Sequence, residues 1–229
     1  MIRSSMLPML LAKMPPPKWI FNVPGLEESW LSCLKLAEQH GELVQVERGS
    51  VFTQVPDHLH MILKGCVIAV IDVADDISAP SFVCALSRGD ILSPSIIQSI
   101  PISFVARTTT LVISIPKAAL DSGDNDALLW ERLCLALDTG LTRQYAEAAQ
   151  SSFQCDQDRI LRVIAQLASH PEAQKTQIGI EVEASKEELR LWAGVHKRSA
   201  SRAFRNLVDS GVASFSGYKR VMLLGQPSA

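Results

Sequence analysis

Two helices joined by a tight turn are predicted between Glu183 and Gly211, and this passage constrains the fold more than any other part of the chain. Ser185 followed by Glu188 is the pattern of a capping box, in which the serine hydroxyl accepts from a backbone amide and the glutamate reaches back to the cap amide. Gly194 is suited to the positive φ of the turn. The passage therefore has the pattern of a helix-turn-helix unit.

The second of these helices, from about Lys197 to Asp209, has one apolar and one cationic face. The residues expected to face inward are Ala200, Ala203, Phe204, Leu207 and Val208, and those expected to face outward are Lys197, Arg198, Ser201, Arg202 and Arg205. A solvated helix surface usually mixes charge signs, because like charges at i,i+4 destabilise a helix by ~0.2–0.5 kcal/mol. We therefore expect an anionic partner; a solvated basic face on a structural helix is the alternative.

A short hairpin is predicted after these helices, in the run GVASFSGYKRVMLL, with its turn at Ser216 and Gly217. The alternating run from Gln177 to Glu183 supplies another strand. Lys219 and Arg220 at the hairpin are placed to reach phosphates beside a nucleic-acid groove. From Asp156 onward there are eleven basic and eight acidic residues, whereas the rest of the chain has eleven basic and sixteen acidic ones. A basic C-terminal part is typical of a module that binds a polyanion.

Short β-branched runs separated by glycine and proline extend from Leu43 to Ile115 and predict an antiparallel sandwich or jelly roll. A short amphipathic helix is expected before them, from Leu26 to Gln39. After Pro116 the pattern becomes helical. A further helix is expected to begin with Asp156 as its N-cap, and Cys155 and Asp156 mark the expected domain boundary.

A helix of almost thirty residues is predicted from Asp124 to Ser152, with an apolar stripe that favours a homodimer interface. Gly140 near its middle allows a second backbone to approach closely. The candidate interface residues are Leu129, Leu133, Leu137, Gly140, Leu141 and Gln144. The alternative is that the stripe packs only on the sandwich of its own chain.

Several function classes are disfavoured by the sequence. The longest apolar stretch, Met61 to Val73, contains Lys64 and Asp72, so a membrane span is excluded. The five cysteines are scattered without a CxxC pair, which fits a reducing cytoplasm and no zinc site. No Walker loop, HExxH or GxSxG motif is present, so an enzyme is not expected. His58 and His60 are expected to be structural rather than metal ligands, and Cys155 is the one thiol considered for redox sensing.

These features together resemble the CRP/FNR superfamily of bacterial transcription regulators, over about Leu43 to Leu224. LHMILKGCVIAVI is similar to the family's strand motif, and ALSRGDILS is similar to the Gly-Asp loop before its phosphate-binding cassette. The family's paired Ser-Arg pattern falls on His196-Lys197 and Ser201-Arg202, so base reading is implied for Lys197, Arg198 and Arg202. The candidate DNA-binding residues are Lys197, Arg198, Ser199, Ser201, Arg202, Arg205, Lys219 and Arg220.

Two departures from that family argue against cyclic AMP as an effector. The cassette arginine that neutralises the cyclic phosphate is replaced at Ile100, and a buried phosphate without a cationic partner is costly. The purine-contacting pair of the long helix is replaced by Gln144 and Tyr145. An iron-sulfur cluster of the family's other branch is also unsupported, because residues 1–32 contain no cysteine.

The predicted chain is α+β and has four parts. Residues 1–42 form an N-terminal segment with a short helix, 43–118 a cyclic-nucleotide-binding-like jelly roll (double-stranded β-helix), 119–155 a long dimerisation helix and hinge, and 156–229 a winged helix-turn-helix domain. The resemblance implies a cytoplasmic homodimer that binds a palindromic operator in double-stranded DNA and works with RNA polymerase. It implies no metal and no cofactor, and leaves the effector open. The alternative is a degenerate nucleotide-binding-like signalling or interaction module without specific DNA binding.

Overall fold

The chain divides into two compact units, Met1–Ile68 with Leu86–Gln144 and Ala69–Ala85 with Tyr145–Ala229. The computed structural model describes residues 7–15, 26–52, 58–71, 81–92, 102–120, 139–140, 142–150, 154–171 and 173–225. Within these residues, none of the helices has both the length and the apolar character that crossing a bilayer requires.

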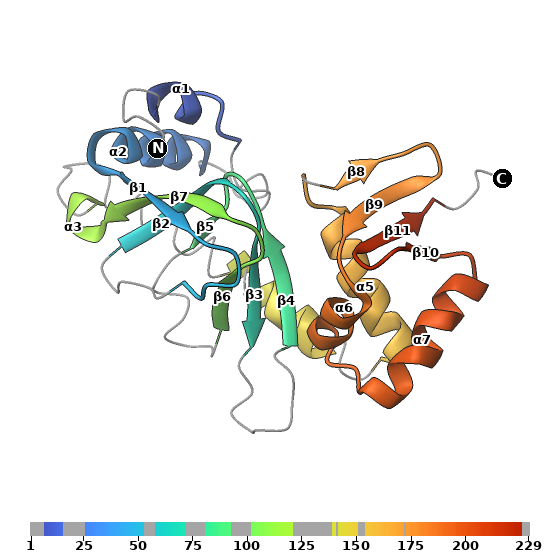
Figure 1. Ribbon diagram of the computed structural model, residues 1–229. Coiled ribbons are helices and arrows are strands. Elements are labelled where there is room, and N and C mark those ends of the chain that lie inside the picture. The colour runs from blue at the N-terminus through green and yellow to red at the C-terminus, as the bar shows by residue number, and fades with distance from the viewer. Residues whose placement is uncertain are drawn as a thin grey trace. The chain divides into compact units, whose positions relative to one another are not determined.

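An antiparallel sheet with strand order β1-β7-β2-β5 forms the centre of the first unit (Figure 1). Its strands are β1 (Glu42–Val46), β2 (His58–Lys64), β5 (Ile91–Leu92) and β7 (Thr110–Pro116). Met61 lies opposite Ile113, and Leu59 lies opposite Ile115. These four side chains are at most 1% exposed. Because alternate residues of a strand share one face, their burial fixes the register of the β2–β7 pair.

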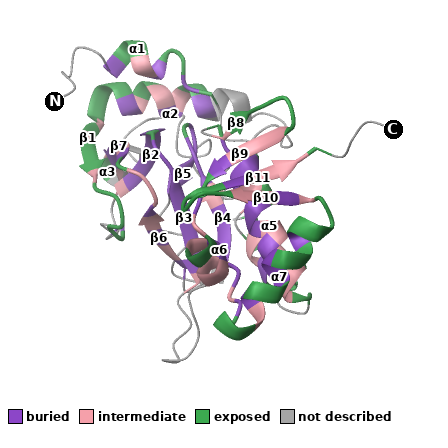
Figure 2. Cartoon of the chain, turned by 45° about the vertical axis from the view of Figure 1, so that its right-hand side comes forward, coloured by how far each residue is buried: buried purple, intermediate pink, exposed green. Residues whose placement is uncertain are grey.

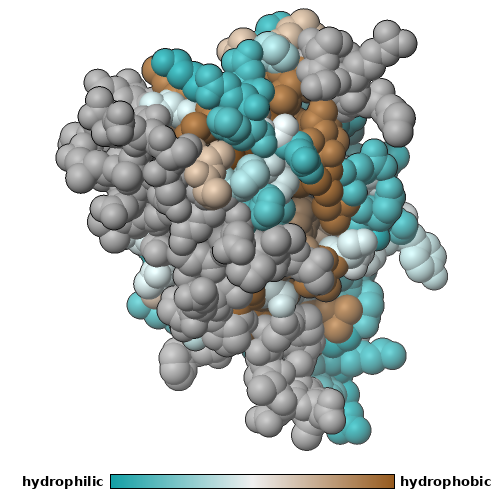
Figure 3. Space-filling view, turned by 90° about the vertical axis from the view of Figure 1, so that its left-hand side faces the viewer, coloured by the Kyte–Doolittle hydropathy of each residue, from teal (hydrophilic) through white to brown (hydrophobic). Residues whose placement is uncertain are grey.

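Three helices accompany this sheet, α1 (Leu7–Leu11), α2 (Leu26–His40) and α3 (Lys117–Leu120). α2 matches the predicted amphipathic helix, with Trp30, Cys33 and Ala37 buried at helical spacing. The opposite face of α2 is not wholly polar, because Leu31 is exposed. Figure 3 shows other hydrophobic residues reaching the surface between hydrophilic ones on this side of the molecule.

A second sheet has the strand order β4-β3-β6, with β3 (Val67–Ile71), β4 (Ser81–Leu86) and β6 (Ile102–Ala106). β6 is followed directly by β7 of the first sheet. The chain turns between them, where the Cys66 carbonyl accepts from the Arg107 amide at 2.8 Å. Val51 forms an isolated antiparallel bridge to Val105 of β6.

The core of the second unit is built from the helices α5, α6 and α7 and a small sheet, with the buried positions purple in Figure 2. The helices are α5 (Asp156–Ala168), α6 (Lys186–Trp192) and α7 (Lys197–Asp209). The sheet has the order β10-β11-β9-β8, with β8 (Gln174–Lys175), β9 (Gly179–Glu183), β10 (Ala213–Ser216) and β11 (Arg220–Leu224). Its core is apolar: Ile160, Val163, Ile164, Leu167, Leu189, Leu207 and Val221 are at most 1% exposed. Burial of these side chains is the main stabilising contribution to this unit.

Two predictions about these helices are wrong in detail. The N-cap of α5 is Cys155, which has extended backbone angles and no side-chain cap hydrogen bond, and Asp156 is the first helical residue. The sequence did not separate these alternatives, because aspartate is favoured both at an N-cap and in a first turn, where it meets the helix dipole. Val208, expected to face inward, is 47% exposed. It follows the fully buried Leu207 and is therefore rotated by about 100° from the buried stripe.

Candidate nucleic-acid interface

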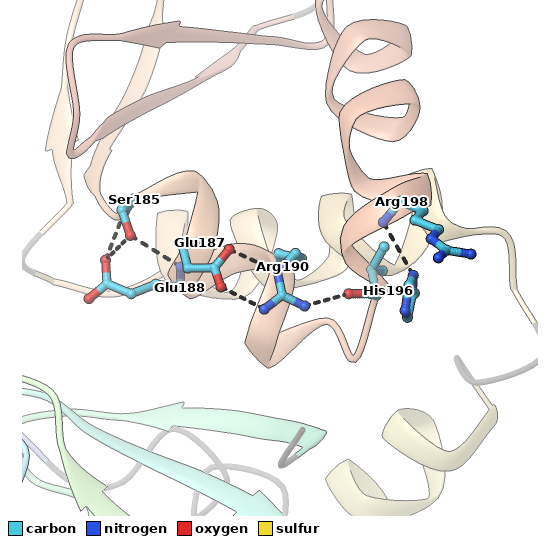
Figure 4. A network of polar contacts seen from close by, with 7 residues as sticks. Ser185, Glu187, Glu188, Arg190, His196 and Arg198 are labelled. Atoms are coloured by element: carbon cyan, nitrogen blue, oxygen red, sulfur yellow. Dashed lines mark hydrogen bonds and ion pairs between the residues drawn. The ribbon is translucent and has the colours of Figure 1, made fainter. Parts of the chain in front are cut away.

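α6 begins with the predicted capping box (Figure 4). The Ser185 hydroxyl accepts from the Glu188 amide at 3.1 Å, and a Glu188 carboxylate oxygen accepts from the Ser185 amide at 2.8 Å. Both amides would otherwise lack a partner at the helix start. The reciprocal pair therefore fixes where α6 starts.

The turn between α6 and α7 is held by Arg190 and shaped by Gly194, whose φ is +60°. The Arg190 guanidinium donates to both carboxylate oxygens of Glu187, at 2.6 and 2.8 Å, and to the Val195 carbonyl at 3.0 Å (Figure 4). These hydrogen bonds from Arg190 lower the pKa of the Glu187 carboxyl, with smaller contributions from the charges of Arg190 and Lys197. Arg190 thus anchors the turn rather than serving as an outward-facing cation.

His196 is the N-cap of α7, a role that the sequence did not predict. Its Nδ1 accepts from the Arg198 amide at 3.2 Å, and its carbonyl accepts from the Ser199 hydroxyl at 3.1 Å. Histidine is not among the preferred capping residues, so no capping pattern marked this position. The contact orders the first turn of α7, from which Lys197 and Arg198 project.

The outward face of α7 is the one that the sequence predicted. Lys197, Arg198, Ser201, Arg202 and Arg205 are exposed, whereas Ser199 is half-buried with its hydroxyl turned to the backbone. On the opposite face Ala200, Ala203, Phe204 and Leu207 are buried. α7 therefore presents four cations and one hydroxyl along one side, and no acidic residue before Asp209.

The predicted hairpin forms a wing beside α7. β10 and β11 pair antiparallel, with Ser216 opposite Arg220, and the turn at residues 217–219 joins them. Lys219 and Arg220 are both exposed. The guanidinium of Arg220 lies 3.8 Å from a carboxylate oxygen of Glu181 on β9, so this ion pair offsets part of the charge of Arg220. Lys219 lies in the turn itself, at the tip of the wing.

Long-range contacts fix α7 against its neighbours, and sequence reasoning missed them. The Arg159 guanidinium on α5 donates to the Gly194 carbonyl in the turn at 2.6 Å. Phe204 of α7 meets Phe215 of β10 edge to face, with ring centroids 5.3 Å apart. No local pattern marks such pairs, because their partners are distant in the sequence. Together they hold α7, the turn and the wing in one arrangement.

The candidate residues of the dimer interface lie only partly within the described part of the chain. Residues 139–140 and 142–150 are helical, with Gly140 and Gln144 half-buried, whereas Leu129, Leu133, Leu137 and Leu141 lie outside the described residues.

Among the part of the chain that the structure describes, no group of three or more His, Cys, Asp or Glu side chains could hold a metal. Cys155 is exposed, and its thiol donates to Asp158 at 3.0 Å.

No protein-family model matches the sequence, and no curated protein matches it. Solved structures do match. The c-di-GMP-responsive global regulator CLP of Xanthomonas campestris has a TM-score of 0.64 and 18% identity, over 89% of this chain and all of that one. A CRP/FNR-family transcriptional regulator from Thermus thermophilus has a TM-score of 0.60 and 19% identity, over 80% of this chain and 94% of that one. The chain has the CRP/FNR fold. A second CRP-family regulator from Thermus thermophilus agrees, with a TM-score of 0.58 and 20% identity over 80% and 92% of the two chains.

The CRP/FNR fold confirms the predicted α+β class. In its jelly roll, the loop with the family-like Gly-Asp pair is described up to Leu92, and Ile100 lies outside the described residues. Asp90 is buried, and its carboxylate accepts from the Ser87 amide at 2.7 Å. The adjacent Arg88 guanidinium donates to the Lys13 carbonyl at 3.1 Å. Both charged groups at this loop are therefore engaged by the chain itself.

Proposed function

We propose that this protein is a sequence-specific DNA-binding transcription regulator of the CRP/FNR type. The observation that carries the proposal is the cationic face of α7, which stands on a capped helix-turn-helix frame beside a wing. Arginine and lysine in the first turns of a recognition helix donate to guanine O6 and N7, worth ~1–3 kcal/mol of discrimination for a good pair. Lys197, Arg198 and Arg202 take that role, while Lys219 and Arg220 contact phosphates.

The proposed regulator acts as a homodimer on a palindromic operator. One winged helix offers few base contacts, and the net charge of the chain after Asp156 is too small for strong nonspecific attraction. Linking two half-sites raises affinity without new contacts, because the second binding event becomes intramolecular. The leucine stripe that begins at Leu129 is the proposed interface between the two chains.

A selection experiment tests the proposal against the alternative of an interaction module. The full-length protein is used to select duplexes from a random DNA pool, and its affinity for the selected duplex and for a scrambled copy is measured at several salt concentrations. We expect enrichment of one palindromic sequence, and affinity that falls with salt on both duplexes. A selected pool that binds no better than the starting pool would favour the module that lacks specific DNA binding.

The proposed regulator does not use cyclic AMP. The cassette position that the family fills with arginine is Ile100, and Arg88 donates to backbone carbonyls of the N-terminal segment. A buried phosphodiester needs a cationic or multi-amide partner. We therefore expect calorimetry to give a Kd for cyclic AMP no tighter than about 1 mM, and DNA affinity to be unchanged by it. A micromolar Kd accompanied by tighter DNA binding would contradict this assignment.

A further inference from the structure

A hollow of about 450 Å³ lies between α6, α7 and the wing, beside the cationic face of α7. Lys186 and Glu187 line it from α6, Lys197 and Ser201 from α7, and Tyr218 from the tip of the wing. The hollow therefore lies between the first turns of α7 and the tip of the hairpin.

The charges around the hollow favour an anion. The ammonium of Lys186 lies 4.9 Å from the centre of the Phe215 ring and 5.8 Å from that of Phe204, so cation–π attraction holds it at the base of the wing. The one carboxylate in the lining, Glu187, is bound on both oxygens by Arg190. Lys186 and Lys197 consequently leave the lining with an excess of positive charge.

Tyr218 is a large, almost fully exposed residue in the lining of the hollow. The residue is 95% exposed, more than any other large hydrophobic residue in the part of the chain that the structure describes. Gly217 before it has a φ of +61°, and this left-handed turn projects the following residue from the hairpin. Tyrosine combines an apolar ring with a hydroxyl, which suits a surface that alternates apolar sugars with phosphates.

We infer that the hollow takes the sugar–phosphate backbone of the DNA strand that flanks the half-site, and that Tyr218 packs its ring on a deoxyribose there. This inference rests on the proposed function and adds Tyr218 as a contact beyond the base-reading residues of α7. Lys186 and Lys197 neutralise the phosphates of the same strand across the hollow. Tyr218 thereby extends the recognised site past the base pairs that α7 reads.

Hydroxyl-radical footprinting of the full-length protein on its selected operator tests the inference, because the radicals attack exposed deoxyribose hydrogens. We expect Tyr218→Ala to lose protection at sugars flanking each half-site, to keep protection over the half-site itself, and to bind about fivefold more weakly, equivalent to ~1 kcal/mol. Tyr218→Phe keeps the ring and should keep the flanking protection. Unfolding midpoints should be unchanged, since the side chain is exposed.

Two controls separate this contact from neighbouring ones. Lys219→Ala should weaken binding and leave the flanking protection in place. An operator trimmed of its flanking base pairs should bind the wild type and Tyr218→Ala equally. If the wild type protects the operator and Tyr218→Ala gives the same footprint and affinity, the inference is overturned. If the wild type protects no DNA, the proposed function fails and the inference falls with it.

Discussion

His60 is a buried imidazole on strand β2. It is 8% exposed, and the Nδ1 atoms of His60 and of His58 have no hydrogen-bond partner among the described residues. Burial lowers the pKa of His60, and the nearby charge of His58 lowers it further. His60 is therefore held in its neutral form.

This burial makes the stability of the protein depend on pH. A histidine with a lowered pKa binds fewer protons in the folded state than in the unfolded state, so acid favours unfolding. The free energy of unfolding should be greatest above the ordinary histidine pKa of 6.5 and should fall as the pH drops from there through the lowered pKa. Urea unfolding at pH 8, 6.5 and 5 measures this.

Two variants assign the effect to His60. The ring centroids of His60 and Phe52 are 6.3 Å apart, so His60→Phe keeps an aromatic ring beside Phe52. This variant should flatten the pH dependence of the free energy of unfolding. His40→Gln, at the exposed end of α2, should leave the dependence as in the wild type. An unchanged slope in His60→Phe would show that another group titrates.

Residue-scale features of the site were predictable only where they depend on nearby sequence. The outward cations of α7 follow from helical periodicity, and the structure places Lys197, Arg198 and Arg202 where that periodicity requires. Arg159 was not predicted, because its contact with the Gly194 carbonyl joins residues 35 positions apart. Such contacts appear only after the chain has folded.

At the scale of elements, the capping box of α6 gives a prediction about stability. Ser185→Ala leaves the Glu188 amide without its acceptor, and loss of an N-cap typically costs ~1 kcal/mol. We expect the free energy of unfolding of the second unit to fall by about that amount in denaturant titrations. Ser185→Thr retains the hydroxyl and should lose much less. Equal losses in the two variants would mean that the hydroxyl is not what stabilises the start of α6.

The elements themselves were predictable to different degrees. α7 spans the predicted residues Lys197–Asp209, because its apolar stripe and its end are marked locally, although no preferred capping residue marks its start. Strand boundaries were less predictable: β6 and β7 are separated at residues 107–109, where the break depends on a hydrogen bond to the distant Cys66 carbonyl. β5 has only two residues and no pattern of its own. Register with a neighbouring strand defines it.

At the scale of the whole molecule, the homodimer proposed on the leucine stripe is open to direct disruption. Leu133→Glu or Leu137→Glu would bury two like charges across a two-fold axis, at a cost of several kcal/mol per dimer. We expect such a variant to become monomeric or insoluble and to lose operator binding, although α7 is untouched. Light scattering and gel-shift assays measure both properties.

A matched control for that experiment is a substitution at an exposed residue of the helical segment 142–150. Ala146 is exposed, so Ala146→Glu adds one carboxylate there without burying it. This variant should remain dimeric and should bind DNA normally. A Leu133→Glu variant that also stays dimeric and binds the operator would place the interface elsewhere, such as on the N-terminal helix that contains Trp30.

The measurement that bears most directly on sequence-specific recognition by α7 is the ratio of operator affinity to random-DNA affinity in two single variants. Arg202→Ala should lower this ratio about fivefold or more, because a base contact worth ~1–3 kcal/mol is lost only on the operator. Lys219→Ala should weaken binding to both DNAs alike and leave the ratio unchanged, because it removes a phosphate contact. If both variants weaken operator and random DNA by equal factors, α7 does not read bases and the central claim is wrong.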